Sequence, residues 1–155
     1  MIDVVSAIIA GLVGGAAMAA ILYLGIGMMP NQMKMNQFRL LGTMMLPDGA
    51  MAYVGGAMIH AVMSIVFAII HVALYAAFGL DSNLVVWGLL FGAVHWAVVG
   101  MALGMMPMMH VGIKNGTIGA PGAFAMGYPM MTTGGFLMLH LVFGLLVGLV
   151  YGALV

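Results

Sequence analysis

Residues 134–155 read GGFLMLHLVFGLLVGLVYGALV, a stretch without a single charged side chain. A run of this length crosses the ~30 Å hydrocarbon core of a bilayer as one helix. Comparable apolar stretches cover 5–28, 55–79 and 84–108. Backbone polar groups in lipid must pair within their own segment, so helices are the expected spanning structure. We therefore predict an all-α membrane protein, a compact bundle of four transmembrane helices forming a single transmembrane domain, 1–155.

The composition excludes most other classes of protein. Of the 155 residues, 66% are hydrophobic and 4% are charged, whereas a soluble surface needs roughly a quarter of its residues charged. The net charge of zero argues against nucleic acid as a partner. The absence of cysteine excludes thiolate metal ligands and a cysteine nucleophile. No span carries a carboxylate, and no base–nucleophile pair is visible, so we do not expect an enzyme.

The two halves of the chain are similar in sequence. GLVGGA at 11–16 aligns with GLLFGA at 88–93, and the second and fourth spans align nearly as well. Self-similarity of this kind indicates an internal duplication. It predicts two parallel helical hairpins, repeat one over 5–79 and repeat two over 84–155.

Four histidines lie within these uncharged spans, and an ionisable side chain inside a membrane is a functional candidate by default. The duplication makes His60 and His140 symmetry mates, near the ends of the first and third spans where methionines gather. Thioether sulfur and imidazole together suit Cu(I). The predicted metal ligands are His60, His140, Met28, Met29, Met105 and Met106.

Two alternatives use the histidines differently. His71 and His95 lie at similar depth nearer the middle of the bilayer, and paired histidines in a helical bundle can hold a haem. These two residues are therefore the alternative axial ligands of a haem b electron carrier, and His60 with His140 forms a second pair of this kind. In the other alternative, the chain is a purely structural subunit without a cofactor, and its histidines only hydrogen-bond between helices.

Methionine occurs 20 times. All but Met1 and Met18 fall toward the side of the bundle that carries the two long loops, whereas a methionine used only as a lipid-compatible side chain would scatter. Flexible, polarizable thioethers suit adaptable protein interfaces. The predicted docking residues are Met44, Met45, Met108, Met109, Met130 and Met131. We accordingly expect a non-catalytic accessory subunit of a membrane redox or copper-dependent complex, with the lipid bilayer and other membrane subunits as its partners.

The connections between spans differ in length. A tight turn at 80–83 joins the second and third spans, whereas the other two loops are long. Leu40 and Leu41 sit at helical spacing and predict a short interfacial helix. The Gly- and Pro-rich segment 109–133 predicts irregular structure. All three basic residues occupy the long loops, which predicts that these loops are cytoplasmic: Lys34, Arg39 and Lys114.

Three segments carry a family resemblance: LHLVFGLLVGLVYGAL at 139–154, IHAVMSIVFAIIHVALYAAFG at 59–79 and GLLFGAVHW at 88–96. The chain resembles small four-helix prokaryotic integral membrane proteins of uncharacterised function. The resemblance implies a four-helix fold in a prokaryotic cytoplasmic membrane, and it transfers no activity.

Overall fold

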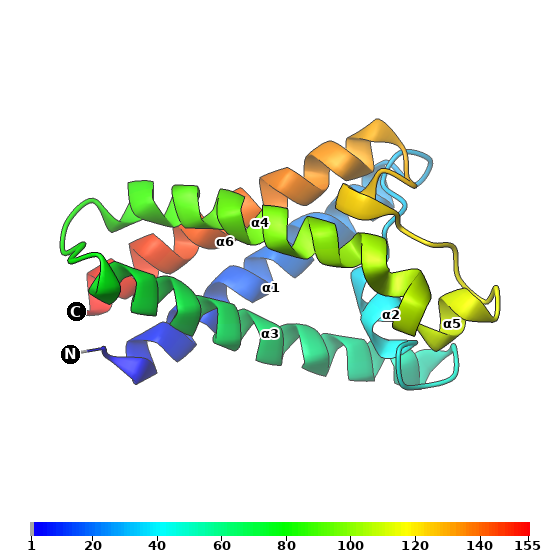
Figure 1. Ribbon diagram of the computed structural model, residues 1–155, viewed down its shortest axis with the longest axis horizontal. Helices are drawn as coiled ribbons and strands as arrows, with labels where there is room; N and C mark the ends of the chain where they lie inside the picture. Colours follow the sequence, from blue (N-terminus) through cyan, green and yellow to red (C-terminus); the bar gives the residue numbers. More distant parts are fainter. Residues whose placement is uncertain (1) are drawn as a thin grey trace. The chain divides into compact units, whose positions relative to one another are not determined.

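The computed structural model describes residues 2–155, and this part of the chain contains helices and no strand (Figure 1). The predicted all-α fold is confirmed. Four of the helices are long and apolar enough to cross a membrane: α1, Val4–Met28; α3, Ala50–Ala77; α4, Leu84–Met109; and α6, Met130–Leu154. Three short elements lie in the long loops: α2, Gln37–Gly42; α5, Val111–Lys114; and the 3-10 helix η1, Ala123–Ala125.

Two of the long helices begin earlier than their hydrophobic stretches predict. Helix α6 begins directly after Pro129, whose fixed φ favours the first turn of a helix. Its first turn accommodates two polar side chains because both find acceptors. The Thr132 hydroxyl donates to the Gln32 carbonyl (2.6 Å), and the Thr133 hydroxyl donates to the Ala125 carbonyl (3.1 Å). Helix α3 likewise runs through a Gly-Gly pair that the sequence pattern placed at the helix boundary.

The chain forms two compact units, and each draws residues from all four long helices. Unit 1 comprises residues 1–21, 61–96 and 137–155, and unit 2 comprises residues 22–60 and 97–136. The tight turn between α3 and α4 belongs to unit 1, whereas both long loops belong to unit 2.

Close helix–helix contacts in unit 1 depend on glycine. A Cβ atom at Gly88 would meet the carbonyl oxygen of Gly144, and one at Gly11 would meet the carbonyl oxygen of Ser64. Small residues let membrane helices approach to backbone contact, so these glycines hold α4 against α6 and α1 against α3. In the predicted duplication Gly11 corresponds to Gly88 and Ser64 to Gly144. The two contacts fit that duplication, which stays a prediction.

In unit 2, the short helix predicted around Leu40 is present as α2. Leu40 and Leu41 are buried. The backbone of α2 lies directly against α3, because a Cβ atom at Gly56 would meet the backbone of Phe38. The segment 109–133 is largely irregular, as predicted, apart from α5 and η1.

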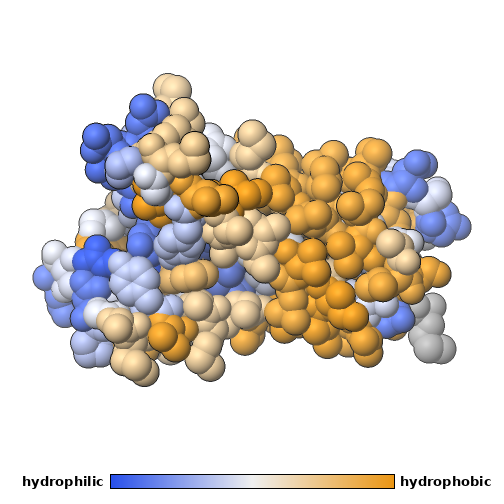
Figure 2. All heavy atoms as spheres, turned by 180° about the vertical axis from the view of Figure 1, so that it is seen from behind, coloured by the Kyte–Doolittle hydropathy of each residue, from blue (hydrophilic) through white to orange (hydrophobic). Residues whose placement is uncertain are grey.

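The surface suits an apolar solvent. Figure 2 shows a continuous patch of strongly hydrophobic side chains over a large part of one face. Exposed valine, leucine and isoleucine side chains occur along all four long helices. An apolar surface of this extent is incompatible with water as the only solvent. Together with the helix lengths, it supports an integral membrane protein.

Candidate functional site

Three histidines gather inside unit 1, one each from α3, α4 and α6. The ring centroids of His95 and His140 are 4.7 Å apart, and those of His71 and His95 are 5.8 Å apart. All three side chains are buried. Gly92 and Gly144 permit this grouping, because a Cβ atom at Gly92 would contact the His140 carbonyl oxygen and the Gly144 Cα. We call His71, His95 and His140 the histidine cluster.

Phenylalanine rings surround the histidine cluster. Phe67 stacks on His95 with ring centroids 3.7 Å apart. Phe143 packs edge-on against His71 at 5.7 Å and against His95 at 5.4 Å, while Phe91 lies 6.1 Å from His71. The imidazoles are therefore in van der Waals contact with apolar rings on several sides.

Hydrogen bonding within the histidine cluster is incomplete. The side chain of His71 is 1% exposed, and within residues 2–155 neither of its ring nitrogens has a hydrogen-bond partner. The Nδ1 atom of His95 also has none. Buried polar atoms without partners are rare in native proteins, and each needs an explanation such as a bound ion or a catalytic role. Three of them on two adjacent rings make this cluster the leading candidate site in unit 1.

His60, the predicted partner of His140, belongs to unit 2. Its Nδ1 lies 2.9 Å from the side-chain amide nitrogen of Gln37, and its ring packs 5.7 Å from the Phe38 ring. The structure therefore groups His140 with His95 and pairs His60 with a residue of α2. Sequence reasoning missed Gln37, because nothing in its spacing relates it to α3.

The methionines predicted as metal ligands differ in burial. Met28, Met29 and Met105 have exposed side chains, and Met106 is half-buried. No group of three or more His, Asp and Glu side chains within the described range is arranged to hold a metal ion. The copper prediction for His60, His140 and these four methionines stays a prediction.

The alternative haem ligands, His71 and His95, are brought into edge-on ring contact. A macrocycle bound between them would have to displace the phenylalanine rings that touch both imidazoles. The observed packing favours a much smaller ligand. The haem alternative also stays a prediction.

Methionine dominates the exposed apolar surface of unit 2. Of the 13 methionines with exposed side chains in the described chain, all but Met138 belong to this unit. They include five of the six predicted docking residues, while Met44 is half-buried. We call these twelve the methionine-rich surface: Met28, Met29, Met45, Met51, Met58, Met101, Met105, Met108, Met109, Met126, Met130 and Met131.

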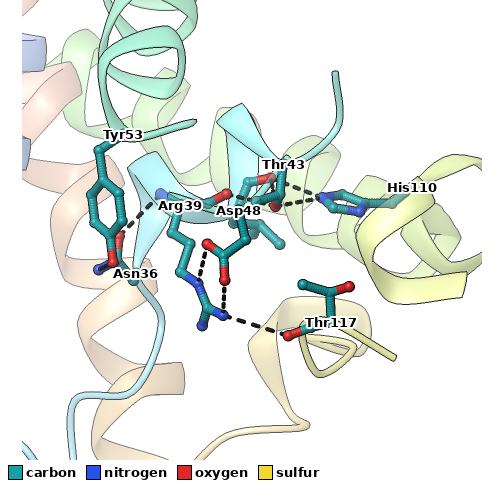
Figure 3. A network of polar contacts seen from close by, with 8 residues as sticks. Asn36, Arg39, Thr43, Asp48, Tyr53, His110 and Thr117 are labelled. Atoms are coloured by element: carbon teal, nitrogen blue, oxygen red, sulfur yellow. Dashed lines mark hydrogen bonds and ion pairs between the residues drawn. The ribbon is translucent and has the colours of Figure 1, made fainter. Parts of the chain in front are cut away.

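Unit 2 also contains a hydrogen-bonded network around His110 (Figure 3). This side chain is 0% exposed, and both of its ring nitrogens have partners. Nε2 donates to the Leu40 carbonyl at 2.8 Å, and Nδ1 accepts from the Ile113 backbone N–H at 3.2 Å, which caps α5. Thr43 donates its hydroxyl hydrogen to the Arg39 carbonyl at 2.7 Å. Sequence reasoning assigned His110 no role, because its two partners come from separate loops.

An ion pair lies beside this network. Two nitrogens of Arg39 donate to the two carboxylate oxygens of Asp48, at 2.9 and 2.6 Å (Figure 3). The hydrogen bonds from Arg39 lower the pKa of Asp48 below its ordinary value. A cavity of about 380 Å³ adjoins the pair and is lined by Met44, Asp48 and Thr117 among others.

Comparison with protein-family models, curated proteins and solved structures finds no match to this chain. The resemblance to small four-helix prokaryotic membrane proteins accordingly stays a prediction from the sequence.

Proposed function

We propose that the chain is a small, non-catalytic accessory subunit of a larger membrane complex, and that it docks through the methionine-rich surface. The partner in this proposal is another integral membrane subunit that offers an apolar helix face. A redox or copper-dependent complex is the favoured class, because thioethers and imidazoles are ligands for soft metals.

One observation carries the proposal: the two units expose different apolar side chains. The exposed aliphatic side chains of unit 1 are mostly valine, isoleucine and leucine, such as Val66, Ile70 and Leu90. In unit 2, methionine replaces them at most exposed positions. Lipid tails accept valine, isoleucine, leucine and methionine alike, so contact with lipid does not explain why unit 2 exposes methionine. An unbranched thioether, however, adapts its shape to a protein surface.

The arrangement of charge supports a non-catalytic role. The only carboxylate in unit 2 is Asp48, and both of its oxygens accept hydrogen bonds from Arg39. A general base must be free to take a proton from a substrate. Asp48 is instead paired with Arg39, whose guanidinium also donates to the Thr117 carbonyl of the second long loop at 3.4 Å.

The test replaces four methionines of the methionine-rich surface with serine: Met45, Met109, Met130 and Met131. Serine removes the apolar, polarizable contact without adding charge, so we expect the variant to lose its partner. The measurement is the mass of the assembly extracted from native membranes in a mild detergent. The matched control replaces four apolar residues of unit 1 with serine, and we expect its assembly to keep the wild-type mass: Val62, Val66, Ile70 and Val94.

Three results would contradict the docking proposal. One is a serine variant whose assembly has the same mass as that of the wild type. Another is a wild-type protein that is extracted alone or only as copies of itself. Release of the partner by the unit 1 control as well would also contradict it, because the docking surface would then not be specific to unit 2.

A further inference from the structure

We propose that the histidine cluster of unit 1 is a binding site for one Cu(I) ion, with ring nitrogens of His71 and His95 as ligands and His140 as a third imidazole within reach. This site goes beyond the docking function proposed above and does not depend on it. It also differs from the ligand set that the sequence repeat predicts, because His60 and the methionines take no part in it.

Two adjacent rings of the histidine cluster carry nitrogens without hydrogen-bond partners among residues 2–155. His71 has two ring nitrogens without hydrogen-bond partners in the described chain, and Nδ1 of His95 is a third. Water cannot compensate such groups inside a hydrocarbon layer, so they persist only where they have a use. A metal ion accepts the one lone pair that each neutral imidazole offers, so a single ion would occupy one ring nitrogen of His71 and one of His95, on two helices at once. The other His71 nitrogen keeps its hydrogen.

The histidine cluster has no negatively charged side chain beside it in the described part of the chain. Unit 1 contains two carboxylates, Asp3 and Asp81, and both lie exposed outside the spanning helices. The chain has no cysteine. The site therefore has no anion to neutralise a bound cation. The cost of moving an ion into apolar surroundings rises with the square of its charge, so a monovalent ion is strongly preferred over a divalent one. Among metals that imidazole binds well, Cu(I) is monovalent and Zn(II) is not.

The packing around the histidine cluster limits the size of a bound ligand. The rings of Phe67, Phe91 and Phe143 pack directly on the imidazoles. A single ion needs only the space between neighbouring rings, and the ring centroids of His71 and His95 are 5.8 Å apart. Cu(I) has a filled d shell and accepts two or three ligands without a demanding geometry. The absence of a three-residue group already arranged for a metal is consistent with a site that needs only two imidazoles.

The experiment measures how tightly the purified protein, in detergent, competes for Cu(I) against a coloured Cu(I)-specific chelator with ascorbate present. We expect the wild type to withdraw about one copper per chain from the chelator. His71→Phe with His95→Phe keeps the aromatic packing and removes the ligand atoms. We expect this variant to bind Cu(I) more than about 100-fold more weakly, since losing an outer-shell partner alone costs about 10–100-fold.

The matched control is His60→Phe, which changes a buried histidine of unit 2 and should leave the copper affinity unchanged. The serine variant of the four docking methionines should also keep its copper, which separates failure of this site from failure of the docking proposal. If the double histidine variant does not fold, judged by helicity and elution volume, X-ray absorption of the copper-loaded wild type decides instead. Only nitrogen ligands are expected around the copper.

Three outcomes would overturn the proposal. The first is a wild type that cannot withdraw Cu(I) from the chelator, and the second is a folded double variant that binds it as tightly as the wild type. The third is a sulfur ligand in the absorption spectrum, which would return the metal to the methionines. Stronger binding of Zn(II) than of Cu(I) would overturn the choice of ion.

Discussion

The two units treat a buried histidine in opposite ways. In unit 1, both ring nitrogens of His71 lack hydrogen-bond partners among residues 2–155, and the ring packs against Phe91 and Phe143. In unit 2, both ring nitrogens of His110 are hydrogen-bonded: Nδ1 caps α5, and Nε2 links it to Leu40 of α2. The contrast shows that burial alone does not identify a functional histidine. The hydrogen bonding of the ring nitrogens is the more informative property. The bonds of His110 account for its burial, whereas the burial of His71 has no such explanation.

The same substitution, histidine to phenylalanine, is expected to have opposite effects on stability in the two units. His110→Phe leaves the Ile113 N–H without its partner and leaves the Leu40 carbonyl with only the Thr43 hydroxyl at 3.4 Å. We expect it to destabilise the protein by about 2–4 kcal/mol, since an unsatisfied buried group costs about 1–3 kcal/mol. His71→Phe removes two unsatisfied nitrogens, so we expect the metal-free protein to become more stable by about 1–3 kcal/mol. Thermal unfolding in a mild detergent, followed by helicity, measures both. Changes of the same sign in the two variants would end the distinction between the units.

A second comparison concerns the glycines of α6. A Cβ atom at Gly144 in unit 1 would run into the backbone of Gly88 and Gly92, whereas one at Gly134 in unit 2 would meet nothing within 4 Å. We expect Gly144→Ala to cost about 1–3 kcal/mol through overpacking. Gly134→Ala should instead stabilise the helix by about 0.5–1 kcal/mol. The free energy of unfolding in denaturing detergent distinguishes them, and a harmless Gly144→Ala would contradict the close contact of α4 with α6.

A weaker effect is predicted for the pH dependence of stability in unit 2. Because Arg39 lowers the pKa of Asp48, the ion pair contributes stability at pH values above the ordinary aspartate pKa. That contribution is lost as the pH falls through the lowered pKa. The effect is small because both side chains are about one-third exposed. We expect Asp48→Asn to lie slightly below the wild type in thermal midpoint at neutral pH and to converge with it in acid. A constant difference at all pH values would show that the carboxylate charge is not responsible.

The sequence predicted the spanning helices well because hydrophobic length is a local property. It also placed His60, His71, His95 and His140 within the spans, and the structure shows that all four side chains are buried. The helix starts were less accurate, because the threonines at the start of α6 find carbonyl acceptors in other segments that a local pattern does not contain.

The pairing of the histidines could not be predicted in the same way. The repeat treats His60 and His140 as equivalent, but Gln37 from the first long loop reaches His60, and His95 from α4 reaches His140. These contacts depend on how each loop returns to its helix and on how far glycine lets helices approach. Neither property is periodic in the sequence.

The thioethers of the methionine-rich surface have a practical consequence. Oxidation to the sulfoxide follows the exposure of each thioether and changes the mass of the peptide that carries it. The protein therefore contains its own set of footprinting probes: brief peroxide treatment should mark exposed side chains such as Met45 and Met130 and spare the buried Met18, Met33 and Met35. Repeated in native membranes, the same treatment would show which methionines of unit 2 are protected from oxidation by a partner, without a label or an antibody.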